Sequence, residues 1–134
     1  MAKPRLRRKR GTVPDAELEV LKVLWDRGTA TIREITDLLY PDGDTSHYAT
    51  VQKLLDRLQE LGCVARQRHA RVNVYRAKID RDDLIREQLQ DAADKLCAGS
   101  MTPLLTQLVD ARQLTPQDIR TLRALVERLG REGE

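Results

Sequence analysis

The sequence has few of the residues that metal sites, disulfide frameworks and membrane spans require. Its 134 residues include only two cysteines, Cys63 and Cys97, and neither has a second Cys or a His at ligand spacing. We therefore expect no metal site and no disulfide, and the two thiols are either buried structural groups or oxidant sensors in a reducing cytoplasm. No apolar run reaches the roughly 18 residues that a membrane-spanning helix needs, and no segment is typical of a secretory signal.

Motifs for catalysis are also missing from the sequence. It contains no Gly-rich phosphate loop and no Ser/His/Asp or Cys/His pattern at a recognisable spacing. His47 falls near the start of an expected helix and His69 falls in an expected turn, so neither is placed for acid–base chemistry. We expect neither enzymatic activity nor a bound cofactor.

Positive charge is concentrated at the N-terminus. Six of the 24 Lys and Arg residues lie in residues 1–10, where there is no acid, and the other 124 residues carry 18 cations against 21 acids. A segment this charged and this short does not fold alone, so residues 1–12 are expected to form a disordered basic arm. Such an arm either follows the phosphates of a nucleic acid or serves as a solubilising leader.

Two short helices are expected after the arm. The apolar period predicts a helix over Pro14–Arg27, with its apolar side in the core, and Gly28 ends it. Thr31 and Glu34 form the T-x-x-E pattern of a capping box, and the helix that they begin runs to Leu39. A Pro-Asp-Gly-Asp turn then leads into a third helix, which together with the second predicts a helix-turn-helix.

The third helix is expected over Ser46–Gly62, with Thr45 or Ser46 as its N-cap. The side opposite its apolar stripe is small, hydroxylated and basic, and carries no acid before Asp56. Small residues allow close approach to a DNA major groove, hydroxyls meet base edges or phosphates, and cations neutralise phosphate. An ordinary amphipathic surface helix is the alternative. The DNA-binding candidates in this helix are Ser46, His47, Ala49, Thr50, Lys53 and Arg57.

After the third helix the period changes to that of β-strands. Cys63–Arg68 and Val72–Arg76 are joined by His69-Ala70-Arg71, which predicts a hairpin. Three helices and a basic hairpin predict a winged-helix domain over residues 13–78, with the hairpin as a wing over the phosphate backbone. A charged edge that prevents aggregation is the alternative. We expect the solvent face of the hairpin to carry Arg66, Arg68, Arg71 and Arg76, of which the first three are DNA-binding candidates.

Residues 79–134 are expected to form a helical dimerisation region. Its helices cover Asp80–Cys97, Pro103–Arg112 and a segment that begins at Pro116 with Thr115 as its cap. Three short amphipathic helices cannot bury all their apolar faces within one chain, so a homodimer is favoured over folding back onto the winged domain. The candidate interface residues are Leu104, Leu105, Leu108, Ile119, Leu122, Leu125, Val126 and Leu129.

Four segments carry a family resemblance. They are AELEVLKVLW at 16–25, TIREITDLL at 31–39, YATVQKLLDRLQELGCVAR at 48–66 and RVNVYRA at 71–77. Together they resemble the penicillinase-repressor family of BlaI, MecI and CopY. The resemblance implies winged-helix homodimers that repress promoters by binding palindromic operators. It places Ala49, Thr50 and Lys53 in the recognition helix and matches Arg71 with a wing arginine, whereas Ala70 stands where relatives usually have glycine.

The same resemblance bears on how the protein is released from DNA. Some members of the family are cleaved within the dimerisation region by a membrane sensor-protease system. Ser100-Met101 lies at the corresponding place here but does not match the cleaved residues. Copper-responsive relatives bind metal through a Cys-x-Cys tail, which this chain lacks.

The sequence therefore predicts a mainly α protein with a small β-hairpin wing, formed by a winged helix-turn-helix domain and a C-terminal helical dimerisation region. Its expected function is that of a cytoplasmic homodimeric transcriptional repressor that binds double-stranded DNA. One alternative is a winged-helix module that binds protein and not DNA, and another is a ligand-sensing regulator of a different winged-helix family. A steep dependence of binding on salt would favour DNA over protein.

Overall fold

The computed structural model describes residues 13–133 and places them in two compact units. The first unit ends at Gln88 and the second begins at Leu89. The boundary lies inside helix α4 (Arg81–Leu96), because Leu84 near the start of this helix is buried in the core of the first unit. The predicted basic arm, residues 1–12, lies outside the described residues.

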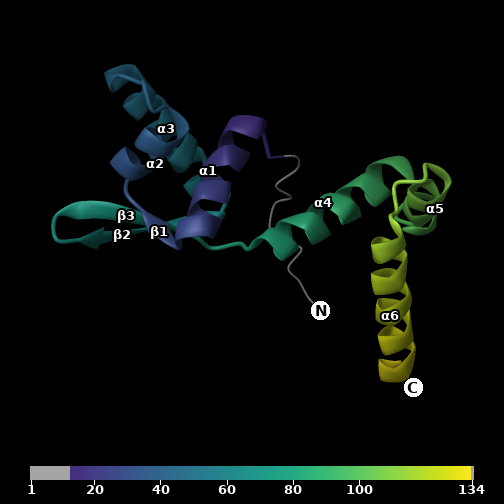
Figure 1. Ribbon diagram of the computed structural model, residues 1–134. Coiled ribbons are helices and arrows are strands. Elements are labelled where there is room, and N and C mark those ends of the chain that lie inside the picture. The colour runs from purple at the N-terminus through teal and green to yellow at the C-terminus, as the bar shows by residue number, and fades with distance from the viewer. Residues whose placement is uncertain (1–12, 134) are drawn as a thin grey trace. The chain divides into compact units, whose positions relative to one another are not determined.

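The described part of the first unit contains α1 to α3, the first half of α4 and a three-stranded antiparallel sheet with the strand order β1-β3-β2 (Figure 1). The predicted mainly α fold with a hairpin wing is confirmed. Strand β1 was not predicted, because two residues are too short to show a β period. In chain order the elements are α1 (Asp15–Arg27), β1 (Thr29–Ala30), α2 (Ile32–Leu39), α3 (Thr45–Glu60), β2 (Val64–His69) and β3 (Val72–Ala77).

Helix ends in this unit follow local side-chain chemistry. Gly28 ends α1 with a φ of 87°, a left-handed conformation that glycine adopts without strain. Thr31 and Glu34 form the predicted capping box at the start of α2. The prediction for α3 was wrong by one or two residues. Its N-cap is Asp44 and not Thr45 or Ser46, because the Asp44 carboxylate accepts the N–H of Ser46.

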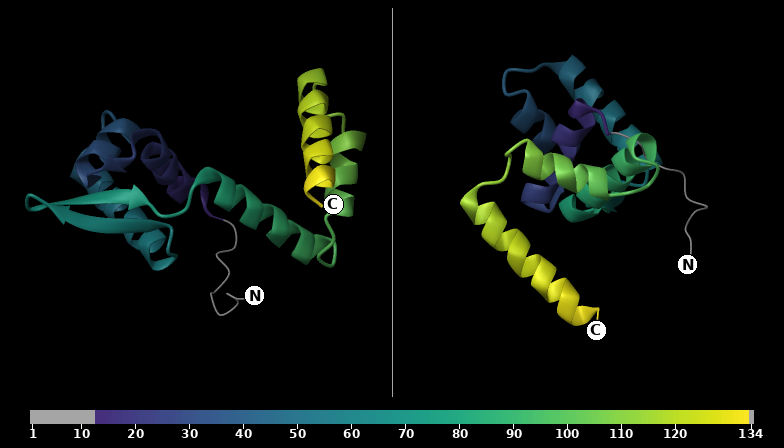
Figure 2. Two further views of the ribbon diagram at one scale, coloured as in Figure 1. Left: turned by 90° about the horizontal axis from the view of Figure 1, so that it is seen from below. Right: turned by 90° about the vertical axis from the view of Figure 1, so that its right-hand side faces the viewer.

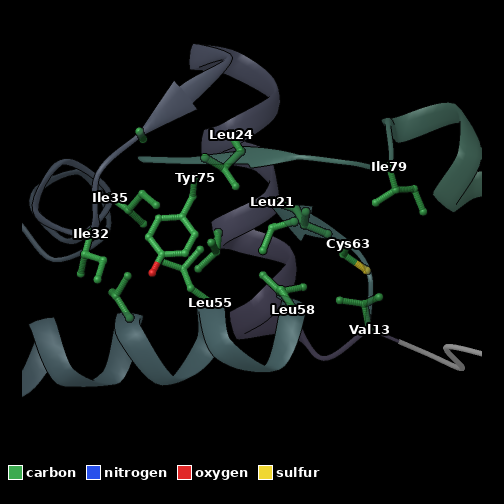
Figure 3. Packing of buried hydrophobic residues seen from close by; sticks show 14 of the residues in the cluster. Val13, Leu21, Leu24, Ile32, Ile35, Leu55, Leu58, Cys63, Tyr75 and Ile79 are labelled. Atoms are coloured by element: carbon green, nitrogen blue, oxygen red, sulfur yellow. The ribbon is translucent and has the colours of Figure 1, made fainter. Parts of the chain in front are cut away.

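The core of the first unit lies between the helices and the sheet. Figure 3 shows Tyr75 pointing from β3 toward Leu55 of α3, with Leu21 and Leu24 of α1 beside them. Tyr75 is 1% exposed and these leucines are buried. Burying a side chain of this size contributes roughly 1.5–3 kcal/mol. The packing fixes which side of α3 faces inward, and with it which side faces solvent.

The hairpin of β2 and β3 projects beyond the three helices (Figures 1 and 2). His69 pairs with Val72, so the loop consists of Ala70 and Arg71 alone. Both loop residues have a positive φ, 51° and 71°, as a two-residue type I′ turn requires. Neither is a glycine, and the left-handed conformation costs roughly 1–2 kcal/mol for each such residue. The wing of this chain thus has a tight turn without the glycine that relieves its strain.

The second unit contains the end of α4, helix α5 (Thr102–Asp110) and helix α6 (Pro116–Glu132). Thr115 and Asp118 form a capping box at the start of α6, as the sequence predicted. Neither α5 nor α6 contains a buried residue, and their large apolar side chains are exposed except for that of Leu104, which is half-buried. None of the helices within residues 13–133 is both long and apolar enough to cross a membrane.

Candidate nucleic-acid interface

The N-terminus of α3 is held by a compact hydrogen-bond network. Oδ1 of Asp44 accepts the N–H of Ser46 at 3.0 Å and the Ser46 hydroxyl at 2.6 Å. Nδ1 of His47 accepts the N–H of Asp44 at 3.2 Å, and the His47 ring lies 4.5 Å from that of Tyr40. Two of the predicted DNA-binding residues, Ser46 and His47, therefore fix the start of the helix.

Asp44 gives this cap a dependence on pH. Hydrogen bonds from the Ser46 hydroxyl and the Ser46 N–H hold the pKa of the Asp44 carboxyl below its usual value. A carboxylate with a lowered folded-state pKa stabilises the fold above its unfolded pKa, and this stability is lost as the pH falls through the folded pKa. We expect the wild-type protein to melt at a higher temperature than Asp44→Asn near neutral pH, and this difference to shrink below about pH 4.

Circular dichroism melting curves of both proteins across the acidic range measure this difference. Asp42→Asn, in the same turn, is the matched control and should give a profile parallel to that of the wild type. If the wild-type and Asp44→Asn midpoints kept a constant separation from neutral pH down through acid, the carboxylate charge would have no part in the cap.

The outward side of α3 carries small and hydroxylated side chains and one exposed lysine. At about 100° per residue, Ala49 and Lys53 lie opposite the buried Val51 and Leu55. Both outward residues are exposed, as is Thr50, whose hydroxyl donates to the carbonyl of Ser46 at 3.0 Å and keeps lone pairs for further bonds.

Acidic side chains limit the extent of this surface. Asp56 and Glu60 lie on the same outward side in the second half of α3, and both are exposed. Carboxylates repel the phosphates of a duplex. The part of α3 from Ser46 to Lys53, which carries no acid, is therefore the part suited to contact a polyanion.

Arg57 has a partner inside the protein. Its Nε lies 3.2 Å from Oε1 of Glu17 on α1, whose side chain is 5% exposed. The second carboxylate oxygen of Glu17 is buried and makes no hydrogen bond to any residue that the structure describes. The Arg57 guanidinium thus supplies the counter-charge of the buried Glu17 carboxylate. Through this ion pair Arg57 links α3 to α1.

The wing arginines do not share one face, so that expectation was wrong. Cross-strand partners point to the same face of a sheet, and Arg66 is paired with Tyr75, the residue that points into the core. Arg66 and Arg68 therefore lie on the face that packs against the helices, while Arg76, paired with Thr29, lies on the opposite face. All of them are exposed, and Arg71 is exposed at the tip.

Two residues beside the outward side of α3 were not predicted as site residues. The guanidinium carbon of Arg33 in α2 lies 5.9 Å from the ring centre of Tyr48 in α3, and Tyr48 is 37% exposed. The helical period predicts that Tyr48 lies on the flank of α3. Its contact with α2, however, depends on the angle between the two helices, which the sequence does not give. The two residues border a groove of about 380 Å³ that is lined by Arg33, Thr36, Asp37, Gly43, Asp44, Thr45 and Tyr48.

The described residues hold no cluster of three or more metal-ligating side chains. Cys63 is buried at the start of β2, and Cys97 is half-buried after α4. The described part of the first unit therefore offers charged and hydroxylated side chains for binding a polyanion.

The chain matches known proteins over nearly its whole length. The family model described as penicillinase repressor matches residues 13–128. The penicillinase repressor of Bacillus licheniformis is 28% identical over 117 residues, which cover 86% of this chain and 89% of that protein. The methicillin resistance regulatory protein MecI of Staphylococcus aureus (strain N315) is 22% identical over 116 residues, with coverages of 87% and 94%.

A solved structure also matches part of the chain. It is the solution structure of the DNA binding domain of the repressor BlaI, with 30% identity and a TM-score of 0.46. The match covers 57% of this chain and 92% of that one. On the strength of the family match over residues 13–128, the chain belongs to the penicillinase repressor family.

Proposed function

We propose that this protein is a DNA-binding transcriptional repressor that binds a palindromic operator as a homodimer. The observation that carries the proposal is that one unit presents Lys53 on the outward side of α3 and four exposed arginines on the adjacent hairpin. A helix of this kind fits a major groove, and the hairpin supplies cations for the flanking phosphates. Membership of a repressor family supports the same function.

The second unit supports the homodimer. Leu105, Leu108, Ile119, Leu122 and Leu125 are between 39% and 55% exposed in the single chain. Apolar surface of this extent is costly in water and marks an interaction face. A second copy of the chain covers it with the same surface, and two winged-helix units held by one dimer then recognise an inverted repeat. We propose that the protein acts in the cytoplasm.

The test of DNA binding uses two substitutions that remove one cation each. Lys53→Ala should weaken binding to the operator about tenfold, because this residue faces the bases and the phosphates that border them. Arg71→Ala should weaken binding to all duplexes by a similar factor and lower the salt slope by about one, since it loses a phosphate contact. Fluorescence anisotropy with labelled duplexes at several salt concentrations measures both effects.

Lys22→Ala is the matched control, because Lys22 is an exposed cation on α1 that pairs with Glu19 at 3.0 Å. It should leave operator affinity unchanged. Failure of the wild-type protein to bind duplex DNA of any sequence at low ionic strength would overturn the proposal. Binding to a protein partner with little dependence on salt would instead identify an interaction module.

Release from DNA is proposed to occur by cleavage between α4 and α5. Ala98 and Gly99 have a positive φ there, 52° and 87°, and Ser100 is exposed. A cut in this segment separates α5 and α6 from the winged-helix unit and removes the dimer. Mass spectrometry of the protein from induced cells would show a fragment that ends near Ser100.

A further inference from the structure

Trp25 joins the last turn of α1 to the segment that leads into α4. Its indole N–H donates to the carbonyl of Ile79 at 2.8 Å, and the guanidinium carbon of Arg81 lies 5.1 Å from the centre of its ring. The first contact is a hydrogen bond that is partly shielded from water, and the second is a cation–π interaction. Trp25 thus makes two directional contacts beyond its packing against the core.

Other contacts hold the same segment from both ends. The N–H of Lys78 donates to the carbonyl of Cys63 at 2.8 Å, and Ile79 is 4% exposed. Asp80 and Asp83 exchange hydrogen bonds from each backbone N–H to the other's carboxylate, at 2.8 and 3.3 Å, which caps α4. Residues 78–84 are therefore fixed on the first unit and do not form a free linker.

We propose that Trp25, Ile79 and Arg81 form a clamp that sets the spacing of the two half-sites in the operator. The inference rests on the proposed function, since it requires a dimer that reads an inverted repeat. Trp25 and Arg81 are positioning residues in this account and do not touch DNA. They hold the first turn of α4 on the winged-helix unit.

The geometry of α4 shows why a small change at its base matters. The helix has 16 residues, which corresponds to a length of about 24 Å at 1.5 Å per residue. A rotation of about 10° at its start moves its far end by about 4 Å, which exceeds the rise of roughly 3.4 Å per base pair. A dimer that distinguishes half-sites differing by one base pair in spacing thus needs this joint held to within a few degrees.

The experiment starts from the duplex that the wild-type protein selects from a randomised library. Two further duplexes carry one base pair inserted or deleted between the half-sites, and a fourth carries one half-site alone. We expect the wild-type protein to bind the selected spacing at least tenfold more tightly than either altered spacing. Trp25→Phe, which loses the N–H donor, and Arg81→Ala, which loses the cation, should each reduce this ratio about threefold or more.

Affinity for the single half-site should stay within twofold of the wild type in both variants, because neither residue lies on the outward side of α3 or on the hairpin. Arg81→Lys keeps a cation over the ring and should restore the ratio, whereas Asp82→Asn, an exposed neighbour, should not change it. Melting curves and sedimentation establish that each variant is folded and dimeric, and Arg81→Ala tests the clamp even if Trp25→Phe does not fold.

The possible outcomes distinguish a failure of the proposed clamp from a failure of the proposed function. Variants that melt at a lower temperature but keep the wild-type ratio of affinities for the selected and altered spacings would show that the contacts only stabilise the fold. The inference would then be wrong. A wild-type protein that binds duplex DNA with no spacing preference would likewise overturn the clamp while DNA binding stands. A wild-type protein that binds no duplex at all would overturn the proposed function itself.

Discussion

Leu122→Glu in α6 is expected to split the homodimer and to lower affinity for the full inverted repeat at least a hundredfold. Leu122 is 39% exposed in the single chain and lies on one stripe with Ile119, Leu125 and Val126. A carboxylate buried in an apolar interface without a partner costs several kcal/mol, so the protein remains monomeric. Linking two binding units raises affinity by about 10²–10⁴, and the monomer loses that gain.

Sedimentation velocity measures the assembly, and anisotropy with full and half operators measures the loss of affinity. Ala124→Glu introduces the same charge at an exposed position on the far side of α6, and should leave the dimer intact. Affinity for a single half-site should be the same in all three proteins. A Leu122→Glu protein that sediments as a dimer would place the interface on another surface of the chain.

The helices of this protein follow from its sequence because their signals are local. Leucine spacing, the capping pairs Thr31 with Glu34 and Thr115 with Asp118, and the stop at Gly28 each depend on residues within one or two turns. The start of α3 was misplaced because its cap is unusual. The reciprocal partner of Asp44 is the imidazole of His47, where a capping box usually has a glutamate or glutamine.

The wing shows where sequence patterns become insufficient. The hairpin was predicted from its β-capable residues, but the face on which each arginine lies depends on register. The two-residue turn at Ala70 and Arg71 pairs Arg66 with Tyr75, which assigns Arg66 to the core side of the sheet. A loop one residue longer would shift this pairing, and the sequence has no Asn-Gly pair to indicate the short turn.

The burial and pairing of charged residues in the first unit could not be predicted from the sequence either. Glu17 belongs to the acidic first turn of α1, where a carboxylate interacts favourably with the helix dipole and is ordinarily exposed. Its burial and its pairing with Arg57 depend on the angle at which α1 crosses α3, which no local signal gives. Arg57 was therefore predicted to bind DNA from its place in the helical period alone.

Arg57→Ala is expected to lower the free energy of unfolding by about 2 kcal/mol. Removing one partner of a fully buried ion pair costs about 3–5 kcal/mol, and the value is smaller here because the Arg57 side chain is 66% exposed. The substitution leaves the buried Glu17 carboxylate without its counter-charge. Glu17→Leu should be close to neutral, since the arginine that it leaves behind is hydrated. Urea unfolding followed by circular dichroism measures both.

The double variant Glu17→Leu/Arg57→Ala decides between the two roles of Arg57. The double variant lacks the Glu17 carboxylate, so no buried charge is left without a partner. It should therefore recover most of the stability lost in Arg57→Ala. Lys22→Ala, which breaks an exposed pair with Glu19, should change stability by less than about 0.5 kcal/mol. Measured well below the melting temperature, Arg57→Ala should bind operator nearly as tightly as the wild type. Unchanged stability together with a tenfold loss of operator affinity would mean that the guanidinium leaves Glu17 and contacts DNA.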